Sequence, residues 1–300
     1  MDIVTGAFSF TGKYIAARLL ELGREVRTLT RHPQSASPFG ERVEAFPLDF
    51  ADPAALTERL RGADTLYNTY WIRAPRGPLT FERVLENTAI LLGAARDGGV
   101  RRVVQLSVSN ASPSSTRPYF RAKGLAEEAL AGSGLSYAIV RPTLVFARED
   151  VLVNNIAWLL RRLPIFFIPG SGTYTLQPVA VEDVAELSVE LGLGTDTTVT
   201  DAAGPDVLSF AELVRLVRDA VGARAAIVRG NPRVALGLCG LLGKLLRDTL
   251  VTRAELTALM QGLLSSQDPP AGRRRFTDWL QANGATLGTS YTSETRRNWS

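Results

Sequence analysis

In the first half of the chain, short apolar runs alternate with amphipathic segments. Residues 1–6 form an apolar run, and Ile15, Leu19 and Leu20 then recur at helical spacing within residues 11–22. Further strand-like runs lie at 25–30, 43–48, 64–71, 101–109 and 135–143, and further helical segments at 52–60, 81–99 and 119–134. Such alternation predicts right-handed crossovers and helices on both faces of a sheet. We therefore expect an α/β fold, a Rossmann-type doubly wound parallel sheet.

The alternation becomes less regular after about residue 148. Strand-like and helical segments are still predicted, at 179–192, 197–204, 209–222, 224–228, 231–264 and 273–284. We expect a nucleotide-binding domain at 1–148 and a smaller C-terminal α+β substrate lobe at 149–300. Part of that lobe is expected to continue the main sheet.

Composition and charge narrow the possible partners. The net charge is +4, and the basic residues are spread along the chain, so no nucleic-acid partner is expected. One cysteine, Cys239, and one histidine, His32, cannot supply an intrachain disulfide or an ordinary zinc site, so no metal is expected. No apolar run reaches the roughly 18–20 residues that span a bilayer, and no signal peptide is visible. We therefore expect a cytoplasmic protein.

The stretch VTGAFSFTG, residues 4–12, has the form of a phosphate-binding loop. It follows a predicted strand and opens a predicted helix, whose N-terminal N–H groups favour a pyrophosphate. Gly6 permits a tight turn and Gly12 permits close packing, but Ser9 occupies the usual middle glycine position. We expect the site to survive this change, with the serine hydroxyl able to donate to a phosphate oxygen. The candidate contacts in the loop are Gly6, Phe8, Ser9, Phe10, Thr11 and Gly12.

The next predicted strands indicate which dinucleotide binds. The second strand ends in Thr30-Arg31, where an NAD site usually places a carboxylate for the ribose hydroxyls. Since no carboxylate is present and Arg31 can pair with a 2′-phosphate, we favour NADP over NAD. Asp49 and Phe50 follow the third strand, at the position expected for adenine.

A tyrosine and a lysine, Tyr119 and Lys123, lie four residues apart in RPYFRAKGLAEEAL and share one face of a predicted helix. A nearby ammonium favours the phenolate, so the tyrosine can exchange a proton with a substrate oxygen while hydride moves. The preceding strand ends in Ser107 and Ser109, either of which can hold that oxygen.

Several stretches together resemble short-chain dehydrogenases/reductases of the extended or atypical kind. They are VTGAFSFTG, TRHP, LDF, NTAILLGAARDGGVRRVVQLSVS, YFRAK, LSYAIVRPTLVF and QPVAVEDVA, within about residues 1–190. The run from Ile139 to Ala185 is similar to NmrA-like proteins, and most similar to the Rossmann-type accessory subunit of respiratory complex I and its bacterial relatives.

The resemblance implies roles for individual residues. Ser109, Tyr119 and Lys123 would form the catalytic trio, with Lys123 also holding the nicotinamide ribose. Asp183 is expected to cap a helix rather than to catalyse. The remaining implied cofactor contacts, beyond the phosphate loop, are Arg31, Asp49, Phe50, Asn68, Ser107, Pro142 and Thr143.

Two functions of different classes follow. The first is an oxidoreductase of the reductase, dehydrogenase or epimerase-like kind. It would transfer hydride between NADP(H) and a small, hydrophobic carbonyl or alcohol. Its substrate side is expected to include Tyr70, Trp71, Asn154, Trp158 and residues 164–170. The second is a catalytically silent NADPH-binding accessory, assembly or redox-sensor protein, because some members of this branch keep Tyr-x-x-x-Lys in such roles.

One apolar segment bears on possible partners. The predicted helix at 234–246 could contact a membrane surface or a protein complex, or serve as a buried core or dimer element. The sequence defines neither the substrate nor the oligomeric state.

Overall fold

The computed structural model describes residues 1–246, 248 and 250–293. By compactness the chain divides into two units, Met1–Pro142 with Val181–Ala202, and Thr143–Ala180 with Ala203–Ser300. The boundary near residue 148 that the sequence suggested stays a prediction. Each unit is described below by itself.

Within the described residues, unit 1 contains a seven-stranded sheet in the order β11-β6-β5-β4-β1-β2-β3, with every neighbouring pair parallel. The α/β Rossmann-type fold expected from the sequence is therefore confirmed. The strands are β1 (Asp2–Thr5), β2 (Val26–Thr30), β3 (Val43–Pro47), β4 (Thr65–Asn68), β5 (Arg102–Leu106), β6 (Ser136–Pro142) and β11 (Thr198–Ala202).

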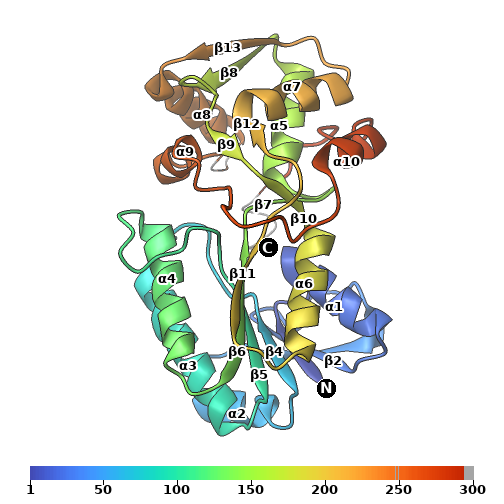
Figure 1. Ribbon diagram of the computed structural model, residues 1–300, viewed down its shortest axis with the longest axis vertical. Coiled ribbons are helices and arrows are strands. Elements are labelled where there is room, and N and C mark those ends of the chain that lie inside the picture. The colour runs from blue at the N-terminus through green and yellow to red at the C-terminus, as the bar shows by residue number, and fades with distance from the viewer. Residues whose placement is uncertain (247, 249, 294–300) are drawn as a thin grey trace. The chain divides into compact units, whose positions relative to one another are not determined.

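Helices cover both faces of this sheet, with α2, α3 and α4 on one side and α1 and α6 on the other (Figure 1). The central strands β4 and β5 are buried throughout, as expected for a parallel sheet covered on both faces. The helices are α1 (Phe10–Glu21), η1 (Gly40–Arg42), α2 (Pro53–Leu60), α3 (Phe81–Asp97), α4 (Pro118–Ala131) and α6 (Val181–Leu193).

One buried arginine joins several segments of unit 1. Arg102 lies in β5 with only 1% of its surface exposed. Its guanidinium donates to the carbonyl oxygens of Leu191 and Asp196 and to the hydroxyl of Ser136. These bonds satisfy a group that would otherwise be costly to bury, and they fix the connection between α6 and β11.

Unit 2 is built from short pairs of strands and from helices. The strand pairs are β7 (Leu144–Phe146) with β10 (Pro178–Ala180), β8 (Ile165–Pro169) with β13 (Ala226–Gly230), and β9 (Thr175–Leu176) with β12 (Leu208–Ser209). The helices are α5 (Val151–Arg162), α7 (Phe210–Ala220), α8 (Pro232–Leu246), α9 (Arg253–Met260) and α10 (Phe276–Asn283).

Two local expectations from the sequence differ from the structure. The segment 231–264, expected to be helical, contains two helices, α8 and α9, and a capping box of Thr252 and Glu255 starts α9. Asp183 is not a helix cap. Strand β10 runs directly into α6, so Asp183 lies inside the first turn, where its charge suits the helix dipole.

Candidate nucleotide and catalytic site

The loop between β1 and α1 has the backbone that its glycines require. Gly6 has φ of +67°, a conformation that residues with a Cβ rarely adopt. A Cβ on Gly12 would lie 2.2 Å from the carbonyl oxygen of Gly6. Both glycines are therefore needed for the first turn of α1 to pack against the end of β1.

Ser9 closes this loop from within. Its hydroxyl donates to the Gly6 carbonyl at 2.6 Å, and its backbone N–H donates to the same oxygen at 2.8 Å. As the N-terminal cap of α1 it makes no side-chain capping bond. The serine therefore rigidifies the turn in place of the usual glycine, and its hydroxyl proton is directed to the loop's own backbone.

The geometry of this loop suits a pyrophosphate. The N–H groups that open a helix have no partner inside that helix, and they carry the positive end of its dipole. The first turn of α1 contains no acidic residue that would repel a phosphate. The left-handed Gly6 and the close packing at Gly12 bring the N-terminus of α1 next to the end of β1, which is the arrangement of a phosphate-binding turn.

The next predicted contacts lie after β2 and β3, whose carboxyl ends share one edge of the parallel sheet with that of β1. Arg31 is exposed directly after β2. Asp49 accepts a hydrogen bond from the backbone N–H of Ala51, in a tight turn after β3. The ring of Phe50 lies 4.9 Å from that of Tyr70, centroid to centroid.

Asn68, at the end of β4, is fully buried. Its carboxamide donates to the side chain of Gln105 at 2.8 Å and accepts from the hydroxyl of Thr5 and the N–H of Tyr70. These bonds join three adjacent strands at the edge where the loop begins. The Asn68 side chain therefore stabilises the ends of the strands from which the loop begins.

Tyr119 and Lys123 lie on α4, one helical turn apart. Pro118 at the first position favours the start of this helix. A Cβ on Gly124 would lie 2.3 Å from backbone atoms of Ser112 and Pro113. The glycine therefore lets the helix pack tightly against the loop that follows β5.

The ammonium of Lys123 is buried and has two close neighbours. It donates to the carbonyl oxygen of Leu106 at 2.7 Å, and it lies 4.1 Å from the centre of the Trp71 indole ring. Burial lowers the pKa of Lys123 to about 7, and the charge of Glu127 partly offsets that effect. This lysine is therefore able to exchange a proton near neutral pH.

Aromatic rings surround Tyr119. Its ring makes edge-to-face contacts with Trp71, Phe81 and Phe120 at centroid distances of 6.4, 6.1 and 5.6 Å. Trp71 thus contacts both the tyrosine and the lysine. Its indole N–H is buried, with no hydrogen-bond partner in the part of the chain that is described.

The two candidate serines differ in their surroundings. The hydroxyl of Ser107 donates to the buried carboxylate of Glu127. Ser109 is fully buried, and its N–H donates to the carbonyl of Pro142 at 2.9 Å. The hydroxyl of Ser107 is therefore engaged with α4, and the choice between the two serines stays a prediction.

Glu127 and Arg141 were not predicted from the sequence. Besides Ser107, the Glu127 carboxylate accepts two hydrogen bonds from Arg141 of β6, one of them from Nε at 2.9 Å. Glu127 follows Lys123 by four residues and Tyr119 by eight, so all three lie on one face of α4. That spacing was the signal that could have found Glu127.

Other predicted residues belong to unit 2. The hydroxyl of Thr143 donates to the carbonyl of Gln177. Asn154 donates to Ser290 and Thr292 and accepts from the N–H of Gly288. Asn154 therefore anchors the segment near residue 290, and its amide is occupied within unit 2.

Trp158 contacts the same segment. Its ring lies 5.4 Å from that of Tyr291, centroid to centroid, and the guanidinium of Arg162 lies 4.8 Å from the indole. Trp158 is thus packed by residues of its own unit.

Neither a metal-binding cluster nor a membrane-spanning helix is found among the described residues. In the described ranges no cluster of three or more His, Cys, Asp or Glu side chains could hold a metal ion. None of the helices described here is long and apolar enough to cross a bilayer.

The chain is similar in sequence to several known proteins. Residues 6–153 match the NAD(P)H-binding family. The chain is 27% identical over 230 residues to NADH dehydrogenase [ubiquinone] 1 alpha subcomplex subunit 9, mitochondrial, of Arabidopsis thaliana; the match covers 73% of the chain and 57% of that protein. It is 27% identical over 235 residues to the ceramide reductase of Caulobacter vibrioides, covering 75% of the chain and 72% of the reductase.

Solved structures show the same fold. The Citrobacter sp. triphenylmethane reductase complexed with NADP(H) superposes with a TM-score of 0.73 and 19% identity, over 96% of each chain. These findings agree with the resemblance to atypical short-chain dehydrogenases/reductases.

Proposed function

We propose that the chain is an NADP(H)-dependent oxidoreductase, since residues 6–153 match an NAD(P)H-binding family. Its substrate would be a small, hydrophobic carbonyl or alcohol. The observation that carries this proposal is the placement of Tyr119 and Lys123 on one face of α4, next to the buried end of β5. A ceramide reductase and a triphenylmethane reductase among the similar proteins support the reaction class.

The residues present would hold the dinucleotide at the start of α1. Backbone groups of Phe10, Thr11 and Gly12 would bind the pyrophosphate, since they open the helix. When bound, the nicotinamide supplies or accepts the hydride. The chain itself contributes orientation, charge and the proton.

Tyr119 would act as the acid/base group. In the reducing direction its phenol O–H gives a proton to the substrate oxygen as hydride reaches the carbonyl carbon, and an alcohol results. The Lys123 ammonium would favour the resulting phenolate, and Ser109 would donate a hydrogen bond to the same oxygen. The rings of Trp71, Phe81 and Phe120 around Tyr119 favour an apolar substrate.

Preference for NADP over NAD is the finer part of the proposal. Arg31 is exposed directly after β2, where no carboxylate is present to hold ribose hydroxyls. Arg31→Ala should weaken NADPH binding about tenfold or more, because a charge-assisted bond to the 2′-phosphate is lost, while NADH binding changes little. Equal losses for both dinucleotides in calorimetric titrations would remove this role.

A second candidate function has its own supporting observation. The Lys123 ammonium is bonded to the Leu106 carbonyl and covered by Trp71, an arrangement that keeps the lysine away from solvent. A protein that holds NADPH without turnover, as an accessory, assembly or sensor protein, needs no mobile lysine. The similarity to a complex I subunit is consistent with this alternative.

One experiment separates the two functions. The purified chain is incubated with NADPH and a panel of apolar ketones, aldehydes and quinones, and the loss of NADPH absorbance is followed. Turnover that falls by about a hundredfold or more in Tyr119→Phe, with NADPH affinity preserved, supports catalysis. Tyr137→Phe, a change of the same kind in β6, serves as the control.

Two outcomes would count against the enzyme. Equal turnover in wild type and Tyr119→Phe would remove the acid/base role of the tyrosine. Saturable NADPH binding with no turnover of any compound in the panel would favour the silent alternative.

A further inference from the structure

Helix α8 of unit 2 exposes a stripe of large apolar side chains. Val234, Leu238 and Leu241 are 51%, 45% and 68% exposed. Their spacing of four and three residues places them on one side of the helix. Single exposed apolar residues are ordinary, but a contiguous row of this kind marks a contact surface.

The opposite side of α8 is packed on unit 2. Ala235 is only 6% exposed, and Leu236 packs against the hydrophobic core that α5 and α7 share. The same helix contacts β8. The fold therefore holds α8 in place with the apolar stripe facing outward.

Charges of one sign accompany the stripe. The sequence contains no acidic residue between Asp219 and Asp248, whereas it contains basic residues at positions 224, 229, 233, 244 and 247. Arg233 and Lys244 are exposed on α8 itself. These two residues are eleven positions apart, which is close to three helical turns, so the two cations lie along one line beside the stripe.

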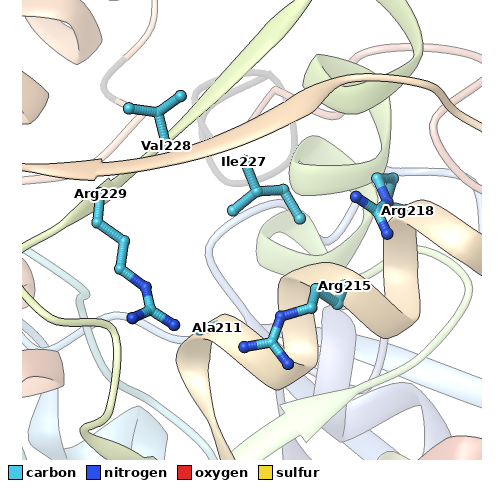
Figure 2. Close-up of a pocket in the computed structure, with 6 residues that line it drawn as sticks. All are labelled: Ala211, Arg215, Arg218, Ile227, Val228 and Arg229. Carbon is cyan, nitrogen blue, oxygen red and sulfur yellow. The ribbon is translucent and has the colours of Figure 1, made fainter.

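A groove beside β13 carries the same charge. Figure 2 shows Arg229 from β13 and Arg215 from α7 directing their guanidinium groups toward the same space near Ala211. Arg218 also lines this groove, paired with Asp219. Arg229 precedes Val234 by only five residues, so the Cα atoms of these two residues are at most about 18 Å apart.

We propose that Val234, Leu238, Leu241, Arg233 and Lys244, together called the α8 face, dock the chain on an anionic phospholipid surface. The apolar stripe would enter the boundary between headgroups and acyl chains, parallel to the membrane plane. Arg233 and Lys244 would extend to the lipid phosphates beside it. The arginines of the groove would add attraction for the same headgroups.

The charge pattern favours a membrane over a second copy of the chain. In a two-fold contact each face meets an identical face, so Arg233 and Lys244 would oppose cations of the partner. No acidic residue within 221–247 could relieve that repulsion. An anionic bilayer supplies both the apolar phase and the opposite charge.

Sedimentation of the full chain with vesicles tests this proposal. The expected result is binding to vesicles of phosphatidylcholine mixed with phosphatidylglycerol, with little binding to phosphatidylcholine alone. Binding should weaken at high salt, because screening removes the electrostatic attraction. Leu241→Ser and Lys244→Glu should each reduce binding about tenfold.

Matched changes elsewhere keep the test specific. Val207→Ser removes an equally exposed apolar side chain of unit 2, and Arg61→Glu reverses an exposed charge of unit 1. Both should bind vesicles like the wild type. Urea titration of every variant verifies that the chain remains folded.

Three results would overturn the proposal. One is absence of binding to the anionic vesicles, and another is equal loss of binding in the control variants. The third is a dimer in gel filtration that Leu241→Ser converts to a monomer, which would make the α8 face an interface between copies.

Discussion

The two units of this chain differ in how much of their backbone is hydrogen-bonded within a continuous sheet. In unit 1 the backbone ladders of seven parallel strands carry the structure, and helices pack on buried strands. In unit 2 the described strands form short pairs, one of them extended by a bridge between Leu176 and Leu264, and side chains hold much of the irregular backbone, as Arg102 does at one connection of unit 1. Arg161, for example, donates to the carbonyls of Gly284 and Leu287. The periodicity of apolar residues therefore predicts much of unit 1. The fold of unit 2 depends more on individual polar side chains that bind distant backbone.

The largest effect is expected in the loop of unit 1. Gly12→Ala places a Cβ 2.2 Å from the Gly6 carbonyl, so the loop must open or α1 must move. NADPH affinity should fall about a thousandfold, equivalent to about 4 kcal/mol. Gly93→Ala, at a helix position with open space around it, should leave affinity unchanged. Calorimetric titration measures both, and comparable affinities would show that the loop does not contact the nucleotide.

A second change probes the ion pair between Glu127 of α4 and Arg141 of β6. Glu127→Gln leaves Arg141 without its carboxylate partner and Ser107 without a charged acceptor. Breaking a buried pair in this way should lower the free energy of unfolding by about 3 kcal/mol. Glu128→Gln, at the exposed neighbouring position, should cost less than about 0.5 kcal/mol in the same urea titration. Equal costs would mean that the pair contributes little.

Part of the candidate site could be predicted from local patterns in the sequence. The spacing of Tyr119 and Lys123 and the glycines of the loop are local patterns, and α1 was predicted to within one residue at each end. The pairing of Glu127 with Arg141 joins a helix to a strand, so no local pattern displays it. The contact of Trp71 with Lys123 likewise depends on how the segment after β4 meets the distant helix α4.

Unit 2 was harder to predict for a related reason. Asn154 and Trp158 were expected at the substrate side, but they hold the segment near residue 290. Those partners lie more than 130 residues away in sequence. Apolar periodicity identifies a helix such as α5, but it does not identify which distant backbone its polar side chains bind.

The pH dependence of stability tests the buried lysine. The pKa of Lys123 falls from 10.5 to about 7 on burial, so between these values the unfolded chain binds a proton that the folded chain does not. Stability should therefore rise with pH across this window, by about 2 kcal/mol from pH 7 to pH 9. Lys123→Met should lack this rise. Parallel urea titrations of both proteins measure it, and identical slopes would contradict a lysine with a lowered pKa.

The smallest effect is expected at an anchor of unit 2. Asn154→Ala removes three hydrogen bonds to the segment 288–292 and should cost about 1–2 kcal/mol. Hydrogen exchange should increase in that segment and stay unchanged in the strands of unit 1. Gln281→Ala, an exposed change on α10, is the control. Faster exchange throughout unit 1 would show that the two units do not respond separately.

Calorimetric titration of the purified chain with NADPH and NADH directly measures whether the loop between β1 and α1 binds a dinucleotide. We expect one saturable site per chain, formed by the loop that Gly6, Ser9 and Gly12 close, with NADPH bound more tightly than NADH. Absence of saturable binding of either dinucleotide would contradict it.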